Sequence, residues 1–271
     1  MTMATKRKPK KPEKTFRPVH PNAGIELAYR RKLERLIAKM NRSVKFWLRA
    51  AYRQNEPVMA QDDTLPASAL RAAVKKLAAR WQKQFNESAP ALAEWFAQTT
   101  ITRSDQTLRS ILRKGGFSVR FKMTPSARDI MQATINQQVS LIKSIPSQYF
   151  TEIEGMVMRS VQTGRDLQNL TVDLRERYGI TRRRAEFIAR DQNNKATAAI
   201  TRARQDELGV VKAKWRHSGG GRHPRPTHVA MDGKTYDIRK GMYDPAVKRF
   251  IFPGEEPNCR CVSIAIIPGF D

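Results

Sequence analysis

The chain has 271 residues, of which 40% are hydrophobic, which is enough for one large domain or two small ones. This hydrophobic share excludes a protein that is disordered throughout. Lys and Arg number 51 against 25 Asp and Glu, so the formal net charge is +26 at pH 7. A charge of this size favours a polyanionic partner, of which nucleic acid is the commonest. An acidic protein surface is the alternative partner.

The sequence also limits the compartment in which the protein works. No apolar run approaches the roughly 20 residues of a membrane-spanning helix, and the basic N-terminal run lacks the apolar segment of a signal peptide. The two cysteines, Cys259 and Cys261, are too close in sequence for the disulfide framework of a secreted protein. We therefore expect reduced thiols, as in a host cytoplasm.

Residues 1–22 form a basic segment that contains proline and has few apolar residues to bury. This composition predicts a disordered tail that is available for electrostatic contact. The candidate nucleic-acid or anion contacts in it are Lys6, Arg7, Lys8, Lys10 and Lys11.

Long helices are predicted after this tail. From Ile25 onward, apolar residues recur in steps of three and four, as they do on one face of a helix. Pro66 opens a second helix with a similar stripe. Trp47 and Trp81 are expected to be core residues between these two helices. Pro90 predicts a break, followed by a helix that ends at Gly115.

The middle of the chain continues in this way. Residues 117–123 alternate between apolar and polar and predict a short strand. Further helices are expected over 127–145, over 149–163 after a break at Pro146, over about 164–179, and from an N-cap at Thr181 to Gly209.

Beyond Gly209 the pattern changes to short strands separated by Gly, Pro and Asp turns, at 210–215, 236–238, 248–252 and 262–267. The expected fold class is therefore α+β, with a mostly helical N-terminal two-thirds and a small, turn-rich antiparallel β region at the C-terminus. The expected organisation is a tail (1–22), a basic helical region (23–122), a second helical part (123–208) and the β region (209–271).

The last helix of the helical part and the β region after it hold a series of distinctive motifs. An Arg-Ala…Ile-Ala-Arg helix core at 184–190 leads to a strand that ends in Trp at 209–215. An Arg-rich turn with Arg222, Arg225 and His228 follows, then Met-Asp-Gly at 231–233, and Pro-Asn-Cys-Arg-Cys closes the region at 257–261.

In order and spacing, residues 182–261 resemble the phage Mu F-like family of head morphogenesis proteins, also called minor capsid or minor head proteins. One departure is that the family's Thr-Glu after Ile-Ala-Arg is here Asp191-Gln192. The resemblance implies a non-enzymatic, multi-copy virion protein inside the head near the portal, present in the host cytoplasm during assembly. The implied partners are the portal protein, the major capsid or scaffolding protein, and packaged DNA.

The His and Cys residues of this region suggest a metal site. Cys259 and Cys261 stand at i and i+2 on an extended segment, so both side chains point to the same side. With His228 as a third ligand and His223 or His217 as a fourth, they would suit a tetrahedral zinc ion. The alternatives are small buried cysteines with His228 bonded to the turn at Asp232-Gly233, or a redox-active pair.

Two other functions compete with the assembly role. A metal-dependent nuclease is disfavoured because acidic residues near His228 are few, whereas a two-metal site needs several convergent carboxylates. A general DNA-binding protein remains open, with Arg222 and Arg225 as candidate anion contacts. A base-stacking platform is not expected, because most aromatic residues fall on predicted core stripes.

Overall fold

The computed structural model describes residues 13–54, 66–162, 167–221 and 223–268. The chain divides into two compact units, each assembled from separated segments. Unit 1 comprises Met1–Pro21, Thr100–Ile130 and Asn194–Asp271, and unit 2 comprises Asn22–Thr99 and Met131–Asn193. The four consecutive regions expected from the sequence therefore do not coincide with the compact units, because the long helices run from one unit into the other.

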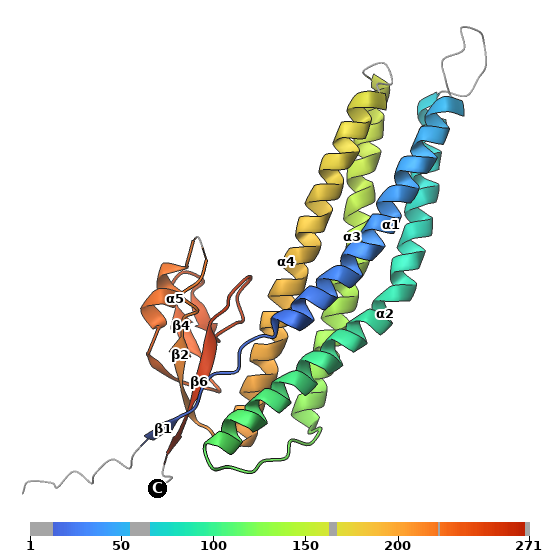
Figure 1. The fold of residues 1–271 in the computed structure, drawn as a ribbon. Coiled ribbons are helices and arrows are strands. Elements are labelled where there is room, and N and C mark those ends of the chain that lie inside the picture. The colour runs from blue at the N-terminus through green and yellow to red at the C-terminus, as the bar shows by residue number, and fades with distance from the viewer. Residues whose placement is uncertain (1–12, 55–65, 163–166, 222, 269–271) are drawn as a thin grey trace, which may run out of the picture. The chain divides into compact units, whose positions relative to one another are not determined.

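Unit 2 is a helical bundle built from parts of four long helices that run side by side (Figure 1). They are α1 (Ala23–Gln54), α2 (Pro66–Lys114), α3 (Pro125–Gln162) and α4 (Leu167–Glu207). Most of the apolar stripe predicted for α1 is buried, with Ile25, Tyr29, Leu33, Met40, Val44 and Leu48 in the core. Ile37 and Tyr52 are also buried, whereas Leu36, which the predicted stripe included, is only partly buried.

The interior of this bundle also contains polar side chains that bond to one another. Tyr29 of α1 donates its hydroxyl to Gln138 of α3 at 2.9 Å, and Gln138 donates to Gln192 of α4 at 2.6 Å. Tyr29 also stacks on Phe96 of α2, with ring centroids 4.5 Å apart. One chain of contacts therefore links all four helices.

Three expected helix breaks are wrong. Pro90 lies inside α2 and Pro146 lies inside α3, and the predicted N-cap Thr181 lies inside α4. A proline removes only one backbone hydrogen bond, and the buried Ala89, Ala93 and Phe96 pack the turns around Pro90 into the core. Thr181 bonds instead to the carbonyl of Arg177, four residues earlier, at 2.9 Å.

The two tryptophans that were expected in the core differ in their solvent exposure. Trp81 is buried, with 5% of its surface exposed, whereas Trp47 is 48% exposed. The stripe of α1 continues from Val44 to Leu48 and Tyr52 in steps of four, which turns Trp47 to the outside. Trp47 instead packs edge-on against the exposed Phe46, with ring centroids 5.3 Å apart.

Unit 1 contains a four-stranded antiparallel sheet with the strand order β1-β6-β2-β3. These strands are β1 (Glu13–Thr15), β2 (Lys212–Arg216), β3 (Thr235–Asp237) and β6 (Val262–Pro268). A separate two-stranded sheet pairs β4 (Met242–Asp244) with β5 (Arg249–Ile251). The α+β fold class and the strands expected near 210–215, 236–238, 248–252 and 262–267 are confirmed.

Residues 13–21 are ordered, so the expected disordered tail is wrong over this stretch, and residues 1–12 lie outside the described part of the chain. Strand β1 pairs with β6, with Lys14 opposite Ile267. Phe16 and Val19 are then buried against Leu108 and Leu112 of α2. Phe16 also meets Phe117 edge-on, at 5.5 Å between ring centroids.

The strand expected at 117–123 does not form, and these residues lie between α2 and α3 outside any helix or strand. Their apolar side chains nevertheless have partners, because Phe117, Val119 and Phe121 pack against the cluster around Phe16. The alternation that predicted a strand therefore reflects packing against one surface rather than strand pairing. Among the helices that the structure describes, none is long and apolar enough to span a bilayer.

Candidate metal centre

His228 is held by the short helix α5 (Pro226–Met231), which the sequence did not predict. Pro226 at the first position suits a helix start, since proline lacks the N–H that would be left unpaired there. The helix turns His228 and Met231 inward. His228 retains only 2% exposure, so its imidazole is removed from solvent.

Both cysteine sulfurs face the same nitrogen of this imidazole. The Nδ1 of His228 lies 3.4 Å from the Sγ of Cys259 and 3.8 Å from the Sγ of Cys261. The two residues are free thiols, each 4% exposed. The expectation that an i, i+2 pair points to one side is confirmed.

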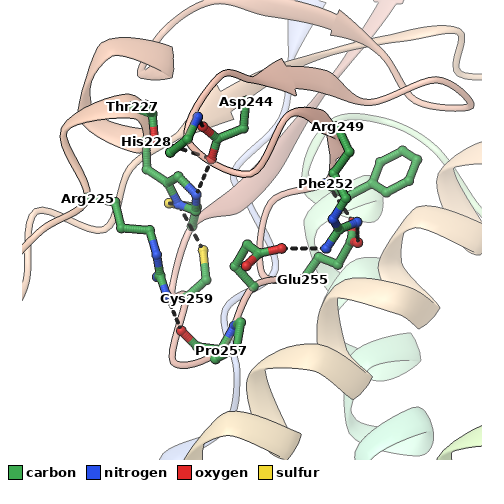
Figure 2. Close-up of polar contacts among 12 residues, drawn as sticks. Arg225, Thr227, His228, Asp244, Arg249, Phe252, Glu255, Pro257 and Cys259 are labelled. Atoms are coloured by element: carbon green, nitrogen blue, oxygen red, sulfur yellow. Dashed lines mark hydrogen bonds and ion pairs between the residues drawn. The ribbon is translucent and has the colours of Figure 1, made fainter.

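Asp244, at the end of β4, lies on the opposite side of the imidazole ring (Figure 2). The Nε2 of His228 is 3.4 Å from the Oδ2 of Asp244. The carboxylate is fully buried, and it accepts hydrogen bonds from the Thr227 hydroxyl at 3.2 Å and from the Ala246 amide at 2.9 Å. These bonds fix its direction toward His228.

The loop before the cysteines takes its shape from two residues in the left-handed region, Gly254 at φ +84° and Asn258 at φ +59°. Arg225 donates to the carbonyl of Pro257 at 2.8 Å, which links this loop to the start of α5. Arg249 of β5 forms ion pairs with Glu255 and Glu256 in the same loop. Contacts at Glu255, Glu256 and Pro257 therefore hold the loop in place just before the cysteines.

The wall of the site belongs to the core of the β region. Trp215 is completely buried and meets His228 edge-on, with ring centroids 5.4 Å apart. Tyr236 packs against Trp215 at 6.1 Å, and its burial raises its pKa to about 12. The two cysteines are themselves part of this core, together with Met231 and Ile251.

The thiols influence each other's ionisation. The hydrogen bond from Cys261, with further bonds from His228 and from backbone groups, lowers the pKa of Cys259 to about 4 despite its burial. The same pairing raises the pKa of Cys261, and burial raises it further. The pairing therefore favours ionisation of Cys259 over ionisation of Cys261.

The other predicted ligands do not join this cluster. Within the described residues, the only His, Cys, Asp or Glu groups placed to share an ion are His228, Cys259 and Cys261. His223 is exposed, and the Nδ1 of His217 accepts a bond from the Gly219 amide at 3.1 Å. Neither therefore supplies the expected fourth ligand.

The Asp232-Gly233 turn forms before β3 as predicted, but His228 does not bond to it. Asp232 accepts instead from the His217 amide at 2.9 Å. Asp244, which takes the place next to His228, had no signal in the sequence. Its role depends on the pairing of β4 with β5, and β4 was not predicted.

Only one of the predicted anion contacts, Arg225, lies in the part of the chain that the structure describes. Lys6, Arg7, Lys8, Lys10, Lys11 and Arg222 lie outside the described residues. Arg225 is exposed, but its guanidinium also holds Pro257. Its contact with nucleic acid stays a prediction.

Gly254 provides a test of how closely the loop before the cysteines packs against α4. A Cβ at this position would lie 2.7 Å from the Cβ of Ala198 on α4, and its φ is unfavourable for any other residue. Gly254→Ala is therefore expected to destabilise unit 1 by about 2–3 kcal/mol, from strain and a clash together. Gly219→Ala is the control, because φ is +66° but no atom lies within 4 Å. Urea unfolding should show a clearly smaller loss of stability for Gly219→Ala than for Gly254→Ala. Equal losses of stability would contradict the close packing of this loop against α4.

Comparison with known families agrees with the resemblance seen in the sequence. Residues 151–264 match the family model described as "Phage Mu protein F like protein". The matched range contains all of α4 and α5, strands β2 to β5, the first residues of β6 and the whole His–Cys cluster. The match therefore supports the resemblance to the phage Mu F-like family that the sequence predicted, over this part of the chain.

Two curated relatives match over longer stretches. An uncharacterized protein of Haemophilus influenzae (strain ATCC 51907 / DSM 11121 / KW20 / Rd) is 29% identical over 260 residues, which cover 93% of this chain and 55% of the relative. The uncharacterized protein YqbB of Bacillus subtilis (strain 168) is 24% identical over 200 residues, which cover 69% of this chain and 63% of the relative. The chain thus spans roughly half to three-fifths of these relatives, and no solved structure matches it.

Proposed function

We propose that the chain is a minor head morphogenesis protein of a tailed phage that joins the procapsid near the portal during assembly. The family match over residues 151–264 carries this proposal. The family implies association with the virion and a structural rather than catalytic role. The portal, the major capsid protein and the scaffolding protein are the proposed protein partners, and several copies act together in one particle.

A second part of the proposal is contact with packaged DNA, either during packaging or during ejection. The support is the formal net charge of +26, since a chain of this charge among dense DNA gains from phosphate contacts. This role and the structural role are compatible, because a protein inside the head meets both shell proteins and DNA.

The role in assembly is tested by deleting the gene from the phage or prophage that encodes it and supplying the chain from a plasmid. We expect the deletion to lower the yield of infectious particles, with abnormal or DNA-free heads in electron micrographs, and the plasmid to restore normal heads. Normal heads and an unchanged yield in the deletion strain would contradict the proposal.

Contact with DNA is tested by the salt dependence of binding. We expect affinity for duplex DNA to fall steeply with salt, with a slope of about −0.9 for each phosphate contacted. A variant with Gln at Lys6, Arg7, Lys8, Lys10 and Lys11 should have a shallower slope. Measuring affinity by fluorescence anisotropy at several salt concentrations checks this, and unchanged slopes would remove the N-terminal residues from the DNA contact.

A metal-dependent nuclease is the competing function. In the described part of the chain, the candidate metal ligands are two thiols and one imidazole, which favours a structural ion over the carboxylate-held ions of a two-metal nuclease. Incubation with plasmid DNA and divalent metals separates the two functions. Cleavage that is lost in His228→Ala would favour the nuclease.

A further inference from the structure

The three donor atoms of the His–Cys cluster have the spacing of ligands around one ion. Zn–S bonds of about 2.3 Å and a Zn–N bond of about 2.0 Å in a tetrahedron place the donors about 3.5–3.8 Å apart. The Nδ1 of His228 lies 3.4 and 3.8 Å from the two sulfurs, and the three donor atoms lie within 4.8 Å of one another. The cluster therefore needs only small shifts to surround a metal ion.

Asp244 gives the imidazole the orientation that a metal ligand needs. A ligating histidine binds through one nitrogen and commonly donates the other N–H to a carboxylate, which fixes the ring and its tautomer. Here Nδ1 faces the sulfurs, while Nε2 lies 3.4 Å from the buried carboxylate of Asp244. The other bonds of that carboxylate, from Thr227 and Ala246, leave it directed at the ring.

We propose that His228 Nδ1, Cys259 Sγ and Cys261 Sγ bind one zinc ion, that water completes the tetrahedron, and that Asp244 positions His228. Two thiolates neutralise the dication, and two sulfurs with one imidazole form a donor set that selects zinc over magnesium or calcium. Both cysteines bind the ion as thiolates, because metal ligands must be deprotonated.

A Cys–His–Asp nucleophilic triad is the other arrangement with these residues. It is disfavoured because both sulfurs share one nitrogen, whereas a triad needs a single nucleophile. Cys259 is also only 4% exposed, so a substrate cannot reach it. Burial prevents a nucleophile from reaching its substrate, but it is compatible with a metal ion that has a structural role.

The effect of the ion would be to join three short pieces of unit 1. His228 comes from α5, Asp244 from the end of β4, and the cysteines from the loop before β6. Short elements of this kind have little core of their own, and metal binding contributes directly to the stability of such regions.

The test uses the full-length chain, purified without a histidine tag under reducing conditions. We expect elemental analysis to find about one zinc ion per chain. Replacement with Co²⁺ should give a thiolate-to-cobalt charge-transfer band and the intense visible bands of a tetrahedral site. Absence of zinc together with failure to take up Co²⁺ would overturn the proposal.

Variants assign the ligands. Cys259→Ser, Cys261→Ser and His228→Ala should each lose stoichiometric metal and the cobalt spectrum. Asp244→Asn should keep the tetrahedral spectrum but weaken zinc affinity about 10- to 100-fold. His223→Ala and His217→Ala are matched controls, because both histidines belong to the same region but lie outside the cluster.

Measurements of folding and of cysteine reactivity distinguish loss of a ligand from loss of the fold, and a metal site from a nucleophile. Circular dichroism of each variant should retain the helical signal, so a ligand variant that keeps this signal but lacks metal supports the assignment. Retention of one zinc ion and the cobalt spectrum in Cys259→Ser or Cys261→Ser would contradict it. Rapid alkylation of a single cysteine in the protein as purified, at a rate unaffected by added zinc, would also contradict it and favour a nucleophile.

Discussion

Asp105→Ala is expected to destabilise unit 1 by about 3 kcal/mol, because it leaves a buried guanidinium without its main partner. Arg204 of α4 is 2% exposed, and its Nε and Nη2 each donate to Asp105 at 2.8 Å. Its Nη1 donates to Glu207 and to the carbonyl of Lys122, both at 2.8 Å. Burial tends to lower the pKa of Arg204, but the bonds to Asp105 and Glu207 outweigh it and raise the pKa.

Arg204→Met should cost less than Asp105→Ala, because it removes the buried charge and keeps an apolar stem beside Phe121. The double variant should therefore be more stable than Asp105→Ala alone. Arg239→Met is the control, since Arg239 pairs with Asp206 in solvent and should change stability little. Hydrogen exchange of the β2 and β6 amides measures unit 1 directly. Equal losses of stability for Asp105→Ala and Arg239→Met would contradict the claim that burial of Arg204 makes its ion pair important for stability.

Gln138→Leu is the second change with a large expected effect, and it acts in unit 2. It removes the acceptor of the Tyr29 hydroxyl and the donor to Gln192 while conserving most of the side-chain volume. Each buried group left unsatisfied costs about 1–3 kcal/mol, so we expect a loss of at least about 2 kcal/mol. Burial already raises the pKa of Tyr29, so ionisation offers the orphaned hydroxyl no relief near neutral pH.

Gln137→Leu is the matched control, because Gln137 precedes Gln138 on the same helix but is exposed. It should be nearly neutral in urea unfolding. Tyr29→Phe combined with Gln138→Leu should recover part of the loss, because both members of one bond are then removed. A loss for Gln137→Leu as large as that for Gln138→Leu would show that the polar contacts between the helices contribute little.

The departure from the family pattern falls in this same network. Asp191-Gln192 stands where the family usually has Thr-Glu, and both residues are buried, with Gln192 donating to Asp191 at 3.0 Å. Gln192 also accepts from Gln138 at 2.6 Å. The replacement thus serves packing between α3 and α4 in this chain.

Periodicity predicted the long helices well, because burial of one face imposes a regular spacing on apolar residues. Tyr29, Leu33 and Val44 are buried as their spacing requires. Trp47 was misplaced because a step of three and a step of four both fit locally, and only the continuation to Leu48 and Tyr52 separates them. The proline breaks were wrong because packing outweighs one lost backbone bond.

The candidate site was only partly predictable, because its members meet through tertiary structure. The i, i+2 spacing of Cys259 and Cys261 predicts two sulfurs on one side, and His228 joins them. Asp244 could not be assigned, since three-residue strands such as β4 carry little signal of their own. The same is true of β1, whose strand exists only through its pairing with β6.

Quantitative mass spectrometry of gradient-purified heads tests the proposed assembly role most directly. Heads from the phage that encodes this chain should contain it at a small fraction of the amount of the major capsid protein, in a fixed ratio to the portal protein. It should resist removal by high salt, which releases proteins held only through DNA phosphates. Complete, DNA-filled heads that lack the chain would contradict the proposed function.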